Sequence, residues 1–175
     1  MTAHLFWIPG PWRGRLAIAA RPRGGEWLED ETKSWRQEGL DVVISLLEIE
    51  EADQLGLALE GGLVVSAGLR FISFPIPDRG LPASLPAASA LCRQVADEAD
   101  AGRNVAVHCR QGIGRSGLIA IGALMASGVD AGQAIELVSA ARGLPVPETE
   151  GQLRWIQKLA EMKILRPTSA VTLHG

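Results

Sequence analysis

Residues 104–126 read NVAVHCRQGIGRSGLIAIGALMA and decide the fold that we expect for the chain. Residues 104–108 are a short run of small and β-branched apolar residues, as is typical of a strand buried on both faces. Residues 109–115 carry two glycines and predict a tight turn, and the apolar run at 116–126 predicts a helix. A buried strand followed directly by a helix is the repeating unit of a parallel sheet covered by helices.

The same alternation continues on both sides of this unit. Apolar, β-branched runs predict strands at 40–47 and 69–74, and a shorter run among prolines and tryptophans predicts one at 16–20. Apolar residues at helical spacing predict helices near 27–35 (ending before Gly39), at 48–59, at 85–101, at 131–142 (capped by Asp130) and near 148–161. We therefore expect an α/β fold: a single domain whose mostly parallel central sheet has helices on both faces.

Length and composition fit one domain and exclude several classes of protein. The chain has 175 residues, 47% of them hydrophobic, and a formal net charge of −3. Because nucleic-acid-binding proteins carry a strongly basic face, we expect no nucleic-acid partner. The sequence also lacks a signal peptide and any run of about 20 apolar residues, which predicts a cytoplasmic protein with no membrane partner. The single domain would span 1–175, with a tryptophan-rich segment at 1–38 before a core at 39–165; its oligomeric state has no signal in the sequence.

Cysteines and histidines are few. Two cysteines, Cys92 and Cys109, do not make a disulfide framework, and a reducing compartment agrees with this number. The three histidines, at positions 4, 108 and 174, are too scattered for a zinc site. We expect neither a metal nor another cofactor.

The turn after residue 108 has the composition of an anion-binding loop. Between a strand and a helix start, successive backbone N–H groups can point inward at one ligand, and glycines permit the backbone conformations that this requires. Arg115 adds a planar guanidinium that can hold two phosphate oxygens at once. The phosphate-binding residues that we expect are Arg110, Gln111, Gly112, Ile113, Gly114 and Arg115.

Cys109 lies at the base of this loop and is the candidate nucleophile. Helix N-termini and nearby cations lower the pKa of a cysteine from about 8.5 to roughly 3.5–7.5, so the donors that hold a phosphate would also hold a thiolate. Ser116 can donate a hydrogen bond to that sulfur, and His108 would orient the loop through its ring nitrogens. The alternative is that Cys109 is an inert buried thiol, the usual fate of a lone cysteine.

At these residues the chain resembles the cysteine-dependent protein tyrosine phosphatase superfamily. HCRQGIGRSG fits its HCx5R[ST]G signature at every fixed position. GLDVVISLL, FPIPDRGLP, this signature and GLPVPETEGQ, from Gly39 through Gln152, are most similar to small dual-specificity-like phosphatases, including bacterial ones and those related to cyclin-dependent kinase inhibitor 3. The resemblance implies the protein tyrosine phosphatase fold and a phosphorylated protein as substrate.

The resemblance also implies roles for residues outside the signature. The family's general acid is an aspartate on a loop about 30 residues before the cysteine, and FPIPD ends in Asp78 at that spacing. Larger relatives position the hydrolytic water with a glutamine, for which PETEGQ offers Gln152; a plain helix N-terminal turn would explain that segment as well. Asp78 could likewise be an ordinary turn residue. Some relatives protect the nucleophile with a second cysteine, but Cys92 lies on the apolar stripe of its predicted helix and is expected in the core.

The predicted reaction is metal-independent hydrolysis of phosphotyrosine, and of phosphoserine or phosphothreonine, through a phosphocysteine intermediate. Two alternatives stay open: a phosphoinositide or other non-protein phosphoester as substrate, and a non-catalytic module that binds phosphoproteins. The chain has no tyrosine, so an aromatic wall beside the substrate would have to come from tryptophan or phenylalanine. Most of these lie before the signature, which favours a shallow, broad site. Arg79 and Arg110 would either contact residues around the phosphosite or be solvated surface charges.

Overall fold

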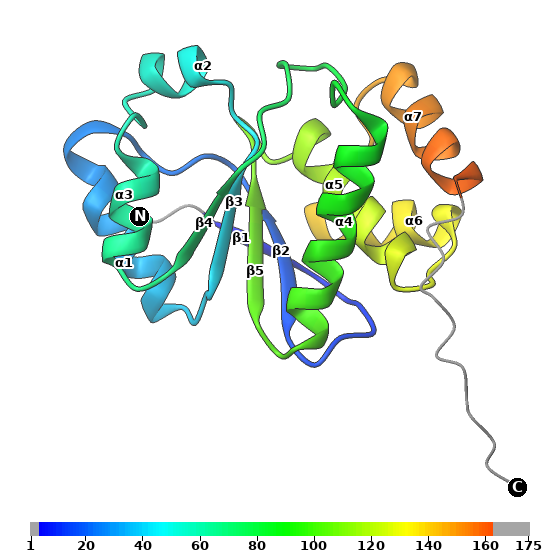
Figure 1. The fold of residues 1–175 in the computed structure, drawn as a ribbon, viewed down its shortest axis with the longest axis horizontal. Helices are drawn as coiled ribbons and strands as arrows, with labels where there is room; N and C mark the ends of the chain where they lie inside the picture. The colour runs from blue at the N-terminus through cyan, green and yellow to red at the C-terminus, as the bar shows by residue number, and fades with distance from the viewer. Residues whose placement is uncertain (1–3, 163–175) are drawn as a thin grey trace, which may run out of the picture.

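Five strands form one sheet, in the order β1-β2-β5-β3-β4 (Figure 1). The structure, a computed structural model, describes residues 4–162, so the predicted end of the core at 165 and His174 lie outside the described residues. β1 pairs antiparallel with β2, and the other three pairings are parallel, which confirms the mostly parallel sheet. The strands are β1 (Leu5–Ile8), β2 (Arg15–Ala19), β3 (Val42–Ser45), β4 (Arg70–Ser73) and β5 (Asn104–His108).

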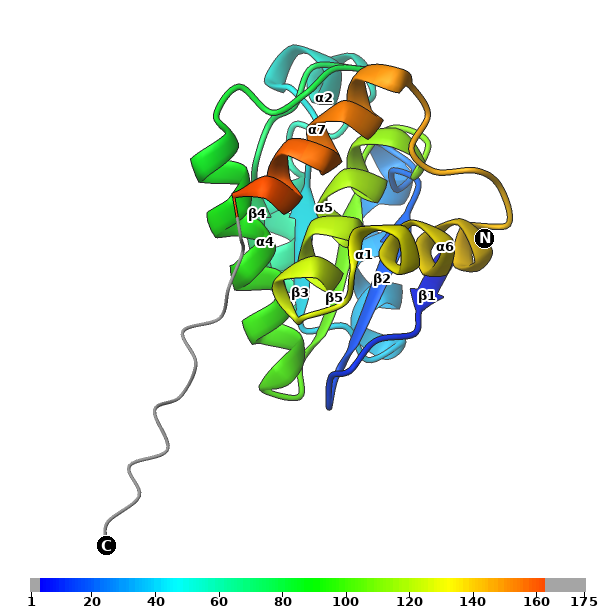
Figure 2. The same ribbon diagram turned by 90° about the vertical axis from the view of Figure 1, so that its right-hand side faces the viewer.

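Helices cover both faces of this sheet, as expected. α1 and α3 lie on one face, and α4, α5, α6 and α7 lie on the other (Figures 1 and 2). α5 is the central helix of the second layer and contacts α4, α6 and α7 as well as strands β2 and β5. The helices are α1 (Leu28–Gln37, after a 3-10 turn at Gly25–Trp27), α2 (Ile49–Gln54), α3 (Glu60–Ser66), α4 (Leu85–Asp100), α5 (Gly114–Ala126), α6 (Ala131–Arg142) and α7 (Glu150–Glu161).

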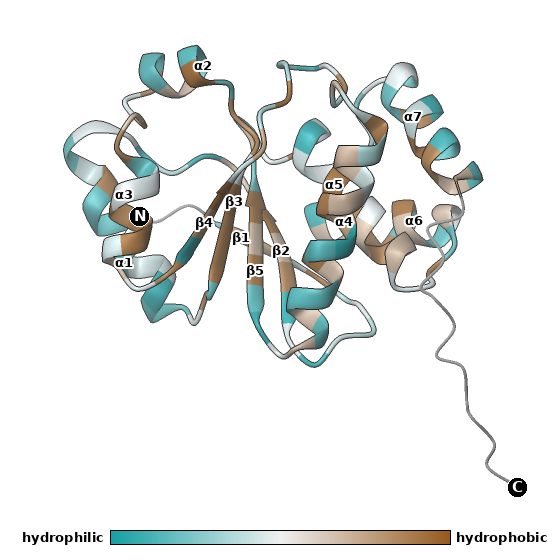
Figure 3. Cartoon of the chain, viewed as in Figure 1, coloured by the Kyte–Doolittle hydropathy of each residue, from teal (hydrophilic) through white to brown (hydrophobic). Residues whose placement is uncertain are grey.

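The two-residue period of the strands divides the core between the two faces. On β2, Leu16 and Ile18 pack toward α4–α7, whereas Ala17 and Ala19 belong to the cluster under α1 and α3. That second cluster is built around the fully buried Trp35. Small side chains on this face of the strands leave room for the indole. The apolar strands therefore lie between two apolar layers, and polar residues lie outside (Figure 3).

The segment after β3 differs from the sequence prediction. One helix was predicted at 48–59, but α2 ends at Gln54 and α3 begins only at Glu60. Gly56 has a φ of +70°, in the left-handed region that ends a helix, and its backbone packs on Gly24 and Gly25. Residues 5–8, for which the sequence predicted no strand, form edge strand β1. The tryptophan-rich segment thus supplies two of the five strands.

The parallel strands bring several loops together at their carboxyl ends. His108, at the end of β5, is paired with Ser45 at the end of β3 and with Ala19 at the end of β2. The loop at 109–113 follows β5, and the loop around Asp78 follows β4. In an open α/β sheet, ligands bind outside the carboxyl ends of the strands.

Candidate active site

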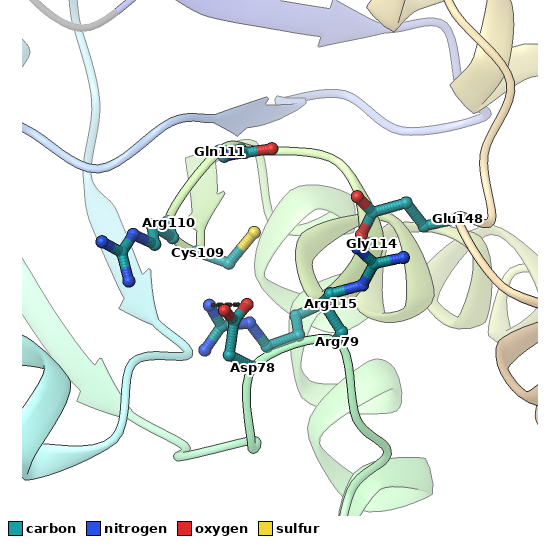
Figure 4. A pocket seen from close by; sticks show the side chains of 8 residues that line it. All are labelled: Asp78, Arg79, Cys109, Arg110, Gln111, Gly114, Arg115 and Glu148. Atoms are coloured by element: carbon teal, nitrogen blue, oxygen red, sulfur yellow. Dashed lines mark hydrogen bonds and ion pairs between the residues drawn. The ribbon is translucent and has the colours of Figure 1, made fainter.

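A cavity of about 340 Å³ opens at this end of the sheet (Figure 4). Its walls come from three segments: the loop around Asp78, the loop after β5 and the start of α5, and the segment before α7. The lining residues are Asp78, Arg79, Cys109, Arg110, Gln111, Gly114, Arg115 and Glu148. Of the predicted site residues, four of the phosphate-binding set line this one cavity together with Cys109 and Asp78, whereas Gly112 and Ile113 do not line it.

The loop conformation requires glycine at one position above all. Gly112 has a φ of +67°, and a Cβ there would lie 2.4 Å from the backbone carbon of Ala19. Gly114 is the first residue of α5, so the loop leads directly into a helix N-terminus and its partial positive charge. Helix α5 was predicted to begin at residue 116, two residues later. The earlier start places Arg115 on the first turn of the helix.

Arg142, on α6, holds the loop from outside. Its Nε donates a hydrogen bond to the carbonyl of Gly112 at 2.8 Å, and its Nη2 donates to that of Gln111 at 3.3 Å. The guanidinium also lies 4.1 Å from the ring centroid of Phe6 on β1. Arg142 therefore ties the carbonyls of two consecutive loop residues to α6.

The Cys109 thiol is 3% exposed and its Sγ lies 3.4 Å from Oγ of Ser116. Burial opposes the thiolate, but the hydrogen bonds from the Ser116 hydroxyl and from the backbone of Ser116 and Ile113, together with the charge of Arg115, outweigh it. The pKa of Cys109 is therefore lowered from its usual value. The predicted contact between Ser116 and the sulfur is present.

His108 is buried behind the loop and contacts a residue that the sequence did not single out. Its Nε2 lies 2.7 Å from Oε1 of Glu60 on α3, and its Nδ1 lies 3.4 Å from the carbonyl oxygen of Cys109. Burial alone would lower the pKa of His108, but the carboxylate of Glu60 and the contact with Cys109 raise it above the usual value. The imidazole joins α3 to the cysteine backbone, in agreement with an orienting role.

Arg115 is 2% exposed and is held mainly by Glu51 on α2. Nη1 and Nη2 donate to the two carboxylate oxygens of Glu51 at 2.7 and 2.9 Å, and Nη1 also donates to the carbonyl of Ile76 at 3.0 Å. These hydrogen bonds from Arg115 lower the pKa of Glu51. The guanidinium of Arg115 is thereby fixed in position: both of its terminal nitrogens bind Glu51, and the residue also lines the cavity.

Asp78 lies over the same guanidinium. Its Oδ1 accepts a hydrogen bond from Nη2 of Arg115 at 3.0 Å (Figure 4). The Asp78 side chain is 54% exposed. An anion that binds Arg115 would meet this carboxylate at the mouth of the cavity. Asp78 is therefore within reach of both the predicted phosphate site and the solvent side.

Gln152 does not line the cavity. It is fully buried on the first turn of α7, and its N–H donates to the capping hydroxyl of Thr149. Its side-chain oxygen accepts from the N–H of Glu148 at 3.1 Å, and its Nε2 donates to the carbonyl of Gly80 at 3.4 Å. Gln152 therefore joins the loop of Asp78 to the segment before α7.

Four residues at or behind the cavity were missed by sequence reasoning: Glu51, Glu60, Arg142 and Glu148. Glu51 lies in a run of acidic residues in which no spacing distinguishes the buried carboxylate from the exposed ones, and Glu60 follows an apolar stretch of the segment predicted as one helix. Arg142 resembles any basic residue in the last turn of a helix. Only Glu148 had a signal, since it belongs to PETEGQ, but it was considered there as part of a helix N-terminal turn.

Residues 4–162 show neither a metal cluster nor a membrane-spanning helix. Within them, no cluster of three or more His, Cys, Asp or Glu side chains is arranged to hold a metal ion. Every helix in the same range is too short or too polar to span a bilayer.

Comparison with known proteins agrees with this geometry. The model of a family described as "Polymorphic toxin system, DSP-PTPase phosphatase" matches residues 17–129, well over half of the chain. The chain belongs to this family. It is a cysteine-dependent phosphatase of the tyrosine and dual-specificity superfamily, and the resemblance in the signature is confirmed.

Solved structures of this superfamily share the fold. Kinase associated phosphatase, in a form whose catalytic cysteine is replaced by serine, is 17% identical, with a TM-score of 0.82 over 93% of this chain and 96% of that one. The phosphatase Tk-PTP in its active form is 28% identical, with a TM-score of 0.70 over 85% and 92%. Human DUSP28 is 18% identical, with a TM-score of 0.63 over 89% and 93%. Among curated protein sequences, none matches the chain.

Proposed function

We propose that this phosphatase removes phosphate from phosphotyrosine, and from phosphoserine or phosphothreonine, of proteins through a phosphocysteine intermediate. The observation that carries the proposal is the position of Cys109. Its thiol has a lowered pKa and lies at the base of the cavity that Arg115 and Asp78 line. A thiolate, a guanidinium and a carboxyl group around one anion-sized cavity are what phosphoryl transfer to sulfur requires.

In the first step, the Cys109 thiolate attacks phosphorus in line with the leaving oxygen. Arg115 and the backbone N–H groups of residues 110–115 hold the three equatorial oxygens, and the N-terminus of α5 adds its partial positive charge. Asp78, protonated, gives its proton to the departing phenolate or alkoxide. The sulfur–phosphorus bond forms as the ester bond breaks.

In the second step, water attacks the phosphocysteine and inorganic phosphate leaves. Asp78, now a carboxylate, accepts a proton from that water. The Ser116 hydroxyl donates a hydrogen bond to the sulfur, which stabilises the returning thiolate. Gln152, proposed from the sequence to position the water, is buried with its amide engaged, so its contribution is to hold Gly80 and Glu148 in place.

The proposed breadth of substrate follows from the cavity wall. No aromatic side chain is among the described residues that line the cavity. A deep slot with an aromatic wall would favour a flat phenyl ring, whereas an open, polar rim also admits the shorter phosphoserine and phosphothreonine. Arg79 and Arg110 at this rim carry charges that suit a phosphorylated, acidic peptide segment.

The test is hydrolysis of an aryl phosphate in excess chelator. Cys109→Ser and Arg115→Ala should each abolish turnover, and Cys92→Ala serves as the matched control that keeps it. Asp78→Asn should slow an alkyl phosphate more than an aryl one, because phenolate leaves more readily without a proton. Turnover that persists in Cys109→Ser would contradict the proposal, and side-by-side rates on phosphotyrosine and phosphothreonine peptides and a phosphoinositide measure the substrate class.

A further inference from the structure

A second cavity, of about 140 Å³, opens between α2, α3 and the end of β4, on the side of the sheet that α3 covers (Figure 1). It shares no lining residue with the cavity of Cys109. Ile49, Ala52 and Asp53 line it at the three- and four-residue spacing of one helix face, whereas Glu51 of the same helix binds Arg115. The proposed reaction therefore makes no use of this second cavity.

Glu60 is the buried carboxylate of this second cavity. The residue is 2% exposed, and it lines the cavity from the first position of α3. Its Oε1 lies 2.7 Å from Nε2 of His108, whereas its Oε2 accepts no hydrogen bond from any group in residues 4–162. A carboxylate oxygen buried without a donor is unfavourable, and buried polar groups in proteins are normally paired. The second oxygen of Glu60 therefore points to a donor that a ligand supplies.

The other polar side chains of the second cavity suit a cation as well. Asp53, which is exposed, supplies a second carboxylate, and Ser45 and Ser73 supply hydroxyl groups. Among the described residues that line the cavity, none is Lys, Arg or His. Because His108 faces Glu60 from behind, the charge of Asp53 remains for a cation that enters from solvent.

The apolar walls indicate what carries this cation. Leu47, Leu57 and Phe71 line the cavity, together with Ile49, which is 71% exposed. A single water molecule needs roughly 10–15 Å³ of cavity volume, so a cavity of about 140 Å³ admits a chain of several heavy atoms. The part of the chain that the structure describes has no cluster of three His, Cys, Asp or Glu side chains for a metal ion. A compact ammonium group with three donors, on an apolar stem, matches both the acceptors and the walls.

We propose that the second cavity binds a primary ammonium group carried on a short apolar chain. The ammonium donates hydrogen bonds to Oε2 of Glu60 and to the carboxylate of Asp53, and the chain lies against Leu47 and Phe71. Two sources have this chemistry: a free alkylamine, and the lysine side chain of another protein. Binding at this site does not depend on Cys109 or on the proposed reaction.

Titration of the full chain with n-butylamine, followed by the chemical shifts of the backbone amides, measures both the affinity and the place of binding. We expect saturable shifts at Ser45, Ala58, Gly61 and Ser73, with a dissociation constant of about 1 mM, an affinity that so few atoms can reach. n-Butanol, a neutral chain of the same length, should bind about tenfold more weakly because it lacks the charge-assisted hydrogen bonds. Saturating inorganic phosphate and the variant Cys109→Ser should leave the n-butylamine affinity unchanged.

Variants of the two carboxylates test the contacts. Glu60→Gln should weaken n-butylamine binding about tenfold. Asp53→Asn should weaken it about threefold, since its carboxylate is exposed to solvent. Asp53 is exposed and outside the active-site cavity, so this variant should keep the turnover of p-nitrophenyl phosphate and gives a result even if Glu60→Gln fails to fold. Glu50→Gln, an exposed residue of α2 that does not line the cavity, is the matched control and should change nothing.

A peptide arm separates the two sources. If the blocked tripeptide acetyl-Ala-Lys-Ala-amide binds as tightly as n-butylamine, the site takes a lysine side chain of a protein; if it binds tenfold more weakly, the site takes a free amine. The proposal is overturned if n-butanol binds as tightly as n-butylamine, if Asp53→Asn leaves the dissociation constant unchanged, or if the shifted amides belong to residues 110–115 instead. None of these results bears on the phosphocysteine reaction, which the Cys109→Ser turnover assay tests separately.

Discussion

The two cysteines of this chain occupy neighbouring sites along α5 and have opposite properties. Cys92, on α4, is fully buried, and burial raises its pKa to about 12. Its Sγ lies 3.8 Å from the carbonyl oxygen of Ile119, which accepts rather than donates a hydrogen bond. Cys109 is almost as buried, with 3% of its surface exposed, yet its pKa is lowered from the usual value.

The comparison shows that burial does not decide the charge of a thiol. Cys92 meets the side of α5, where the backbone N–H groups are used within the helix, and its sulfur packs against Gly122. Cys109 meets the beginning of the same helix, where N–H groups are free to donate. Donors and a cation outweigh the cost of burial at one site and are missing at the other.

Alkylation measures this difference directly and should show the largest effect. At pH 7 a thiol with a pKa of about 12 is ionised to about 1 part in 10⁵, and Cys92 has no exposed surface either. We expect iodoacetamide to label Cys109 alone in the native protein, as read by peptide mass spectrometry. Cys109→Ser should remain unlabelled until denaturant exposes Cys92. Labelling of native Cys92 at a comparable rate would break the comparison.

Glu51→Gln removes the carboxylate that holds Arg115, the cation beside Cys109, and leaves the cysteine itself unchanged. Arg115 loses its charged partner but keeps Ile76 and Asp78, so we expect the free energy of unfolding to fall by about 2 kcal/mol. A guanidinium no longer held in place should also lower kcat/KM by about 10²-fold. Denaturant unfolding and steady-state rates measure both. Glu50→Gln, an exposed neighbour on α2, is the control that should change neither.

Glu60→Gln acts through His108 and should show in the pH dependence of stability. Because the folded-state pKa of His108 is raised, its contribution is complete below about pH 6.5 and is lost as the pH rises through the folded-state pKa. The variant lacks the carboxylate that raises this pKa. The difference in unfolding free energy between the wild type and Glu60→Gln should therefore be largest near pH 6 and shrink toward pH 9. A difference that grows with pH would mean that His108 is neutral in the wild type.

These sites differ in how far sequence reveals them. The loop at 109–115 and its neighbours His108 and Ser116 are contiguous, and their chemistry needs fixed residue types at fixed spacing, so the sequence predicted their grouping. Asp78 was found through its distance from the signature. Glu51 and Glu60 reach the loop from α2 and α3, and that segment was predicted as one helix. Only the chain reversal at Gly56 shows which faces of the two helices point at Arg115 and His108.

The smallest expected effect on activity is that of Cys92→Ala. The sequence left open whether Cys92 protects the nucleophile by forming a disulfide with it. Its sulfur packs against Gly122 of α5, beside Leu159 of α7. A raised pKa keeps it a thiol, whereas disulfide exchange requires a thiolate. Cys92→Ala should therefore keep the wild-type kcat/KM, lose about 1 kcal/mol of stability for the sulfur removed from the core, and be inactivated by peroxide and recovered by thiol at wild-type rates. Faster irreversible inactivation of the variant would show instead that Cys92 reaches Cys109, and the separation of the two cysteines into a reactive and a structural one would fail.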